Sequence, residues 1–215
     1  MLVRSRVIRV GKSVALGVTA LSIFGFYRRE MLIQDFTLED SKGANGFAFS
    51  LTDGLEPLFG TGNDIRGVVK FNIEDPAKST GKLIIGIKSL KLTSEVMTTN
   101  MMGSWCLDAE KFPEATFEVK SAKLTKKEKN GTLIGSVTGD FTIHGITKAI
   151  TVEGTARPVK GGVKTRFGDK DGDLLMLHSE FDFNRYDYKI GTVLEDTAVS
   201  NRVHVRIDCA AMSFK

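Results

Sequence analysis

Three histidines and two cysteines are the side chains of this sequence best suited to acid–base or metal chemistry. His144 falls in a predicted tight turn, and His178 and His204 fall on the polar parity of predicted strands, where we expect them to be exposed. Cys106 and Cys209 belong to no CxxC motif and show no Cys/His ligand spacing. The spacing therefore predicts no catalytic residue, no metal ligand and no cofactor site.

The acidic residues give a similar result. Asp169-Lys170-Asp171-Gly172-Asp173 is similar to a calcium loop with Glu180 at the twelfth position, but Leu174 occupies the sixth position, where that loop needs glycine. A hairpin turn explains the run more simply. No Gly-x-Ser-x-Gly motif or phosphate-binding loop occurs.

An enzymatic alternative would use His144, Asp140 or Asp108 to modify a bound lipid. It ranks last, because no pair of base and nucleophile can be placed from the sequence. The two cysteines leave two alternatives open, a single disulfide or buried free thiols. Cys209 continues the inward parity of Val203, Val205 and Ile207, which favours a buried free thiol at least as strongly as a disulfide.

The elements around these residues are mostly strands. In residues 132–143, apolar side chains and glycines alternate with Thr, Ser and Asp, which places one dry and one wet face on an extended strand. His144-Gly145 then turns the chain back. Comparable alternation predicts strands over 47–51, 66–73, 82–91, 115–124, 132–143, 148–157, 174–183 and 202–213, with a short extra strand at 33–38.

The predicted fold is all-β, an eight-stranded antiparallel lipocalin-like barrel, with a two-layer sandwich as the alternative. Such a barrel has an interior that side chains fill or that holds one small ligand. Four glycines on the inward parity (Gly67, Gly135, Gly139 and Gly154) favour a hollow interior, since they thin the lining and let strands bend.

Residues 93–111 break the β pattern and predict a short helical segment. Met97, Met101 and Trp105 share one helical face, and Thr93 or Ser94 can cap the helix through its hydroxyl. Two interpretations stay open: a flexible lid over a cavity mouth, or a plug that closes one end of the core.

Residues 1–30 resemble an export leader, with a basic start followed by an apolar stretch at 13–27. That stretch is short for a membrane span, which needs about 20 residues. We expect export to the periplasm or outside the cell, with either cleavage or retention as a membrane anchor. Residues 31–215 are expected to form the single barrel domain.

The net charge excludes one class of partner. The chain has 30 Lys and Arg against 26 Asp and Glu, and residues 1–30 contain six of these bases and one of these acids. The remaining 24 bases and 25 acids make the body nearly neutral. Because nucleic-acid binding depends on clustered positive charge, we expect no nucleic-acid partner.

Three segments carry a family resemblance. FTIHGITKAITVEG (141–154), LDAEKFPEATFEVKSAKL (107–124) and FDFNRYDYKIG (181–191) with VSNRVHVRID (199–208) are similar to motifs of the lipid/polyisoprenoid-binding YceI-like family. The chain departs from the sequence pattern of the family at Gly43-Ala44-Asn45-Gly46, and its insertion at 54–64 is longer than in a minimal member of the family. The resemblance implies an exported barrel that holds an isoprenoid or other long lipid.

The leading hypothesis is non-catalytic binding of a polyisoprenoid, an isoprenoid quinone or a similar lipid, for storage or transfer in the cell envelope. The alternative is a structural or adhesive envelope module with a filled core. Oligomeric state stays open, with a dimer as one option. The predicted lining and lid residues are Phe49, Phe71, Ile85, Ile87, Met97, Met101, Trp105, Phe117, Val137, Phe141, Val152 and Phe181.

Overall fold

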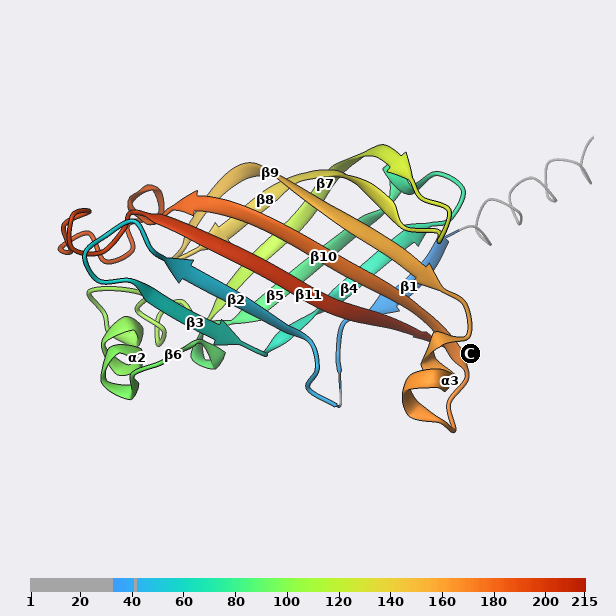
Figure 1. The fold of residues 1–215 in the computed structure, drawn as a ribbon, viewed down its shortest axis with the longest axis horizontal. Coiled ribbons are helices and arrows are strands. Elements are labelled where there is room, and N and C mark those ends of the chain that lie inside the picture. Colours follow the sequence, from blue (N-terminus) through green and yellow to red (C-terminus); the bar gives the residue numbers. More distant parts are fainter. Residues whose placement is uncertain (1–32, 41) are drawn as a thin grey trace, which may run out of the picture.

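A closed antiparallel β-barrel forms the body of the computed structural model, which describes residues 33–40 and 42–215 (Figure 1). Its strands are β1 (Ile33–Thr37), β2 (Gly46–Leu51), β3 (Leu58–Gly62), β4 (Ile65–Asn72), β5 (Thr80–Gly86), β6 (Lys91–Leu92), β7 (Glu114–Lys127), β8 (Leu133–Ile143), β9 (Ile146–Val159), β10 (Gly172–Asn184) and β11 (Arg202–Phe214). The predicted leader at 1–30, with its apolar stretch at 13–27, lies outside the described residues.

Eight strands close the ring in the order β1-β4-β5-β7-β8-β9-β10-β11, and β1 pairs with β11 at Thr37 and Met212. β2, β3 and β6 extend the sheet beyond β11, where β2 pairs with the first half of that strand. All neighbouring strands are antiparallel. The predicted barrel is confirmed, and the sandwich alternative is wrong, because one sheet closes on itself instead of packing against a second layer.

Helices lie at the two ends of the barrel (Figure 1). α2 (Glu95–Met102) lies beside β6 at one end, and α3 (Gly162–Phe167) lies at the other end near the C-terminus. The Ser94 hydroxyl caps α2 by accepting a hydrogen bond from the Met97 amide, as the sequence predicts. α3 buries Val163 against Leu174 and Met212. Within the described residues, no helix combines the length and apolar character needed to cross a bilayer.

One strand prediction needs correction, and two segments contain elements that the alternation did not predict. The strand expected over 82–91 ends at Gly86, and Ile87–Ser89 forms one turn of 3-10 helix before β6 begins. The insertion at 54–64 contains β3, which pairs with β2. The chain between β9 and β10 contains α3, which begins at Gly162 directly after Gly161 in a left-handed conformation.

Inward-facing glycines explain how the barrel bends. A Cβ at Gly67, which has φ of +144°, would lie 2.0 Å from the carbonyl oxygen of Lys82 on the next strand. A Cβ at Gly135 would lie 2.2 Å from the carbonyl oxygen of Lys123. Since no real Cβ tolerates such contacts, glycine is required where neighbouring strands approach this closely.

Candidate ligand-binding site

Two apolar cavities hollow the interior of the barrel. The first, which we name the ring cavity, has a volume of about 210 Å³ and lies inside the closed ring, between β4, β5, β7, β8, β9, β10 and β11. The second, the helix-end cavity, measures about 300 Å³ and is lined by β2, β3, β6, α2, the loop at 189–201 and the adjoining parts of β5, β8, β10 and β11. Both exceed the roughly 150 Å³ at which an engineered apolar cavity stays dry and binds benzene.

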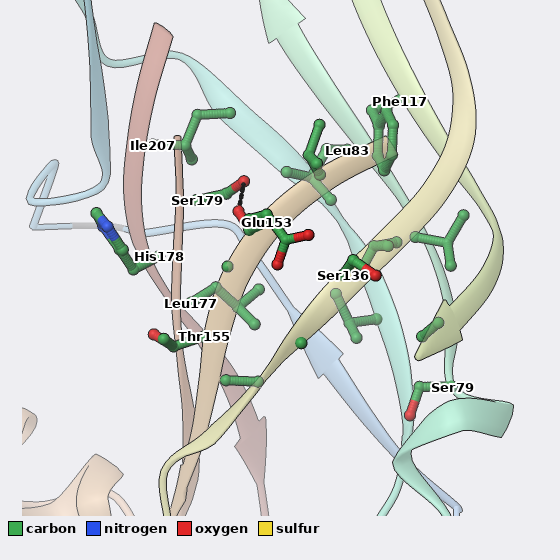
Figure 2. Close-up of a pocket in the computed structure, with 18 of the residues that line it drawn as sticks. Ser79, Leu83, Phe117, Ser136, Glu153, Thr155, Leu177, His178, Ser179 and Ile207 are labelled. Atoms are coloured by element: carbon green, nitrogen blue, oxygen red, sulfur yellow. Dashed lines mark hydrogen bonds between the residues drawn. The ribbon is translucent and has the colours of Figure 1, made fainter. Parts of the chain in front are cut away.

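The wall of the ring cavity is made of alternating residues from long strands. Figure 2 shows Leu83, Phe117 and Leu177, which come from three strands and surround the same space. These inward-facing side chains are only half-buried because they border empty volume instead of other side chains. The alternation of the strands thus lines the cavity with apolar side chains.

Polar groups near this wall are largely satisfied by the barrel itself. Ser179 interrupts the apolar row of β10, and its hydroxyl donates a hydrogen bond of 2.8 Å to the Glu153 carbonyl oxygen (Figure 2). His178 lies on the outer face, with Nδ1 2.8 Å from Asp208. The ring cavity therefore offers a ligand chiefly apolar contact.

The helix-end cavity has a different wall. Met97 and Met101 of α2 and Trp105, which follows the helix beyond Gly103, line it together with Phe49 and Leu58. Met97 and Trp105 are about 40% exposed, so this cavity reaches the molecular surface beside α2. The segment predicted as a lid or plug thus borders a cavity mouth.

All twelve residues predicted from the sequence lie in these walls. Phe71, Phe117, Val137 and Val152 line the ring cavity, and Phe49, Ile87, Met97, Met101 and Trp105 line the helix-end cavity; Ile85, Phe141 and Phe181 border both. Their contact with a ligand stays a prediction. The sequence predicted a hollow interior, and in the structure these two cavities share three wall residues.

The loop after β10 supplies wall residues that strand periodicity could not reveal. Ile190, Leu194 and Val199 line the helix-end cavity, and Arg185 holds their loop in place. Arg185 is 3% exposed, and its guanidinium donates to backbone carbonyls at 2.6–3.2 Å, those of Ile190, Gly191, Leu194, Val199 and Ser200. The only sequence signal was an arginine in a stretch rich in aromatic residues, FDFNRYDY (181–188).

The two cysteines are free thiols in separate cavities, so the disulfide alternative is wrong. Cys106 borders the helix-end cavity and Cys209 the ring cavity. Burial raises the pKa of Cys106 to about 11, although the nearby Arg185 charge acts in the opposite direction. Burial, aided by the Asp208 carboxylate, raises the pKa of Cys209 to about 12. Both thiols are therefore protonated, and poorly nucleophilic, at neutral pH.

Two residues of the enzymatic alternative, His144 and Asp140, are held in structural contacts. His144 packs edge-on against Phe112 at 4.7 Å, and its Nδ1 lies 2.9 Å from the Tyr188 carbonyl oxygen. Asp140 faces outward and pairs with Lys120 at 3.3 Å. Among the described residues, no cluster of His, Cys, Asp and Glu is arranged to hold a metal ion.

Comparisons with known proteins agree with this architecture. A family model described as a YceI-like domain matches residues 36–211. A UPF0312 protein of Yersinia pestis (strain Pestoides F) is 31% identical over 135 residues, which are 61% of this chain and 65% of that one. A UPF0312 protein of Pseudomonas fluorescens is 28% identical over 128 residues, 59% of this chain and 64% of that one. The chain thus aligns with just under two thirds of each relative.

Solved structures share the fold at low sequence identity. BcnA of Burkholderia cenocepacia superposes with a TM-score of 0.62 at 18% identity, over 80% of this chain and 99% of that one. A polyisoprenoid binding domain from Saccharophagus degradans superposes with a TM-score of 0.59 at 12% identity, over 84% of this chain and 99% of that one. At such identity the likeness concerns the fold alone. With most of the barrel matched by the family model, the chain belongs to the YceI-like family.

Proposed function

We propose that this protein binds a long apolar molecule, a polyisoprenoid or the tail of an isoprenoid quinone, inside the barrel without transforming it. The observation that carries the proposal is the pair of apolar cavities in one closed sheet. Burial of each methylene group contributes about 0.8 kcal/mol, so a prenyl chain needs few polar contacts to bind tightly.

The shape of the interior supports an elongated ligand. On β8 the wall of the ring cavity runs from Leu133 to Phe141, which corresponds to about 26 Å of extended strand. Phe141 also borders the helix-end cavity, so the apolar space continues beyond that residue. A compact ligand would leave most of this wall uncovered. The polyisoprenoid-binding character of the Saccharophagus degradans domain adds support through the shared fold.

We place this function in the cell envelope, as storage or transfer of the lipid in the periplasm or outside the cell. Support comes from residues 1–30, whose basic start and apolar stretch resemble an export leader. Retention of residues 13–27 would associate the barrel with a membrane. Fractionation of cells that express the full chain, with N-terminal sequencing of the recovered protein, distinguishes a cleaved leader from a retained anchor.

Native mass spectrometry of the full chain recovered from its own cell envelope tests the binding proposal. We expect a mass increment that is lost on denaturation and that matches a prenyl lipid in the extract. The matched comparison is Val137→Asp, which places a charge in the ring-cavity wall, against Thr138→Asp on the opposite face of β8. Recovery of the wild-type protein without any lipid, and without saturable uptake of added prenyl lipid, would favour the structural module instead.

A further inference from the structure

The ring cavity and the helix-end cavity meet at three residues. Ile85 of β5, Phe141 of β8 and Phe181 of β10 border both spaces, and we refer to them together as the partition. All other lining residues belong to one cavity only. A chain that occupies both cavities must therefore pass the partition.

Phe141 is the fixed member of the partition. It is 5% exposed and lies within three edge-to-face contacts, to Phe181 at 5.8 Å and to Phe183 and Tyr188 at 5.4 Å each. Tyr188 is itself 1% exposed. Because each aromatic pair adds to the energy of burial, displacing the Phe141 ring would disrupt a packed cluster.

Phe181 is held less firmly. Its ring is half-buried, since it has cavity on both sides, and its aromatic neighbours are Phe141 and, at 6.5 Å, Phe183. The ladder between β9 and β10 ends at Glu153 and Glu180, one residue before Phe181. From that point β10 is paired only with β11, where Phe181 lies opposite Val205.

We propose that Phe181 is the residue that determines which ligand lengths this protein accepts. With the ring in its present position, a short apolar chain fits one cavity and a longer chain must displace the ring to fill both. Rotation about its side-chain bonds moves the ring into either cavity without moving the backbone. This inference rests on the proposed function and adds the determinant of chain length to it.

Affinities for a series of prenyl alcohols of increasing length, from geraniol and farnesol through geranylgeraniol to solanesol, test the inference. In Phe181→Ala, the affinity for the longest alcohol relative to the shortest should rise at least about tenfold over wild type. Phe181→Trp enlarges the obstacle and should lower the same ratio. Phe181→Leu repeats the test with a smaller loss of packing should the alanine variant fail to fold.

Two matched controls remove an equally large ring from one cavity only. Phe117→Ala enlarges the ring cavity and Phe49→Ala enlarges the helix-end cavity. Neither residue belongs to the partition, so we expect neither to shift the ratio in the way that Phe181→Ala does. An unchanged ratio in both Phe181→Ala and Phe181→Leu would overturn the inference and leave the proposed function intact. Failure of the wild-type protein to bind any alcohol would overturn the proposed function and this inference with it.

Discussion

Gly135 of β8 lies directly opposite Gly154 of β9 in the wall of the ring cavity. Ser179 of β10 lies opposite Gly154 on the other side, so three neighbouring strands place their smallest inward residues in one row. The larger Leu124 and Ile207 flank this row on β7 and β11. The empty volume therefore lies where three side chains in succession are almost absent.

Filling this row should close the ring cavity. In Ser179→Leu we expect the leucine side chain to occupy the space beside Gly135 and Gly154. The substitution also removes the hydrogen bond from the Ser179 hydroxyl to the Glu153 carbonyl oxygen. Binding of prenyl alcohol to the ring cavity should weaken by at least about tenfold, since the added methylenes replace those of the ligand. Isothermal titration measures the affinity, with Met176→Leu on the exposed face of β10 as the control. Unchanged binding by Ser179→Leu would show that ligand does not use this row.

Alanine at Gly135 should destabilise the barrel. The added Cβ would lie 2.2 Å from a backbone oxygen that belongs to the next strand, and a backbone atom cannot rotate away. We expect a loss of about 1–3 kcal/mol in the free energy of unfolding, measured by urea denaturation. Gly46→Ala is the control, because its Cβ would meet its nearest neighbour at an ordinary 3.4 Å. Equal stability of the two variants would contradict the close approach of β7 and β8.

Replacement of Arg185 should unfold the loop around the helix-end cavity. In Arg185→Met five carbonyl groups of the loop at 189–201 lose their shared donor, so we expect a loss on the order of 3 kcal/mol in the free energy of unfolding. Arg206→Met, which removes an exposed arginine paired with Asp208, should leave stability unchanged. Hydrogen exchange of residues 189–201 shows whether the effect is local to the loop.

The single tryptophan should report ligand binding. Trp105 borders the helix-end cavity and is 42% exposed, so a ligand that covers it removes water from the indole ring. We expect a saturable blue shift of the emission on titration with a prenyl alcohol long enough to enter this cavity. Met97→Ala, beside it in the same wall, should weaken the affinity. A spectrum that stays constant while calorimetry records binding would place the ligand in the ring cavity alone.

Stability should fall at alkaline pH because the buried thiols resist ionisation. Burial raises the pKa of Cys106 to about 11 and that of Cys209 to about 12, whereas the pKa of an unfolded cysteine is about 8.5. Below about pH 8.5, both thiols stay protonated in the folded and in the unfolded state, so their contribution to the free energy of unfolding is fully present. Above that pH the unfolded state loses protons that the folded state retains, so the free energy of unfolding decreases as the pH rises toward the folded values.

Urea denaturation in reductant at about pH 7, 9 and 10 measures this decline. Burial also raises the pKa of Tyr188 to about 12, which adds a loss of the same sign above the usual tyrosine range. The double variant Cys106→Ala/Cys209→Ala should therefore decline less steeply than wild type but not become independent of pH. An equally steep decline in the variant would show that the thiols are not responsible.

Local patterns determined much of the fold. Alternation along residues 132–143 depends only on the two-residue period of a strand, so the inward positions of Val137 and Phe141 followed from the sequence. The cap of α2 by Ser94 is equally local. Residues on predicted strands, such as Phe71, Phe117 and Val152, therefore lie in the cavity wall as expected.

Tertiary structure decided how that interior is divided. The contact between Phe141 and Phe181 joins β8 to β10, strands that are not neighbours in the sheet, and no sequence period encodes a distance across a barrel. The role of Arg185 likewise depends on a loop that folds back over its guanidinium. Periodicity assigns each side chain to a face, but only closure of the sheet determines which side chains meet across the interior and where space remains between them.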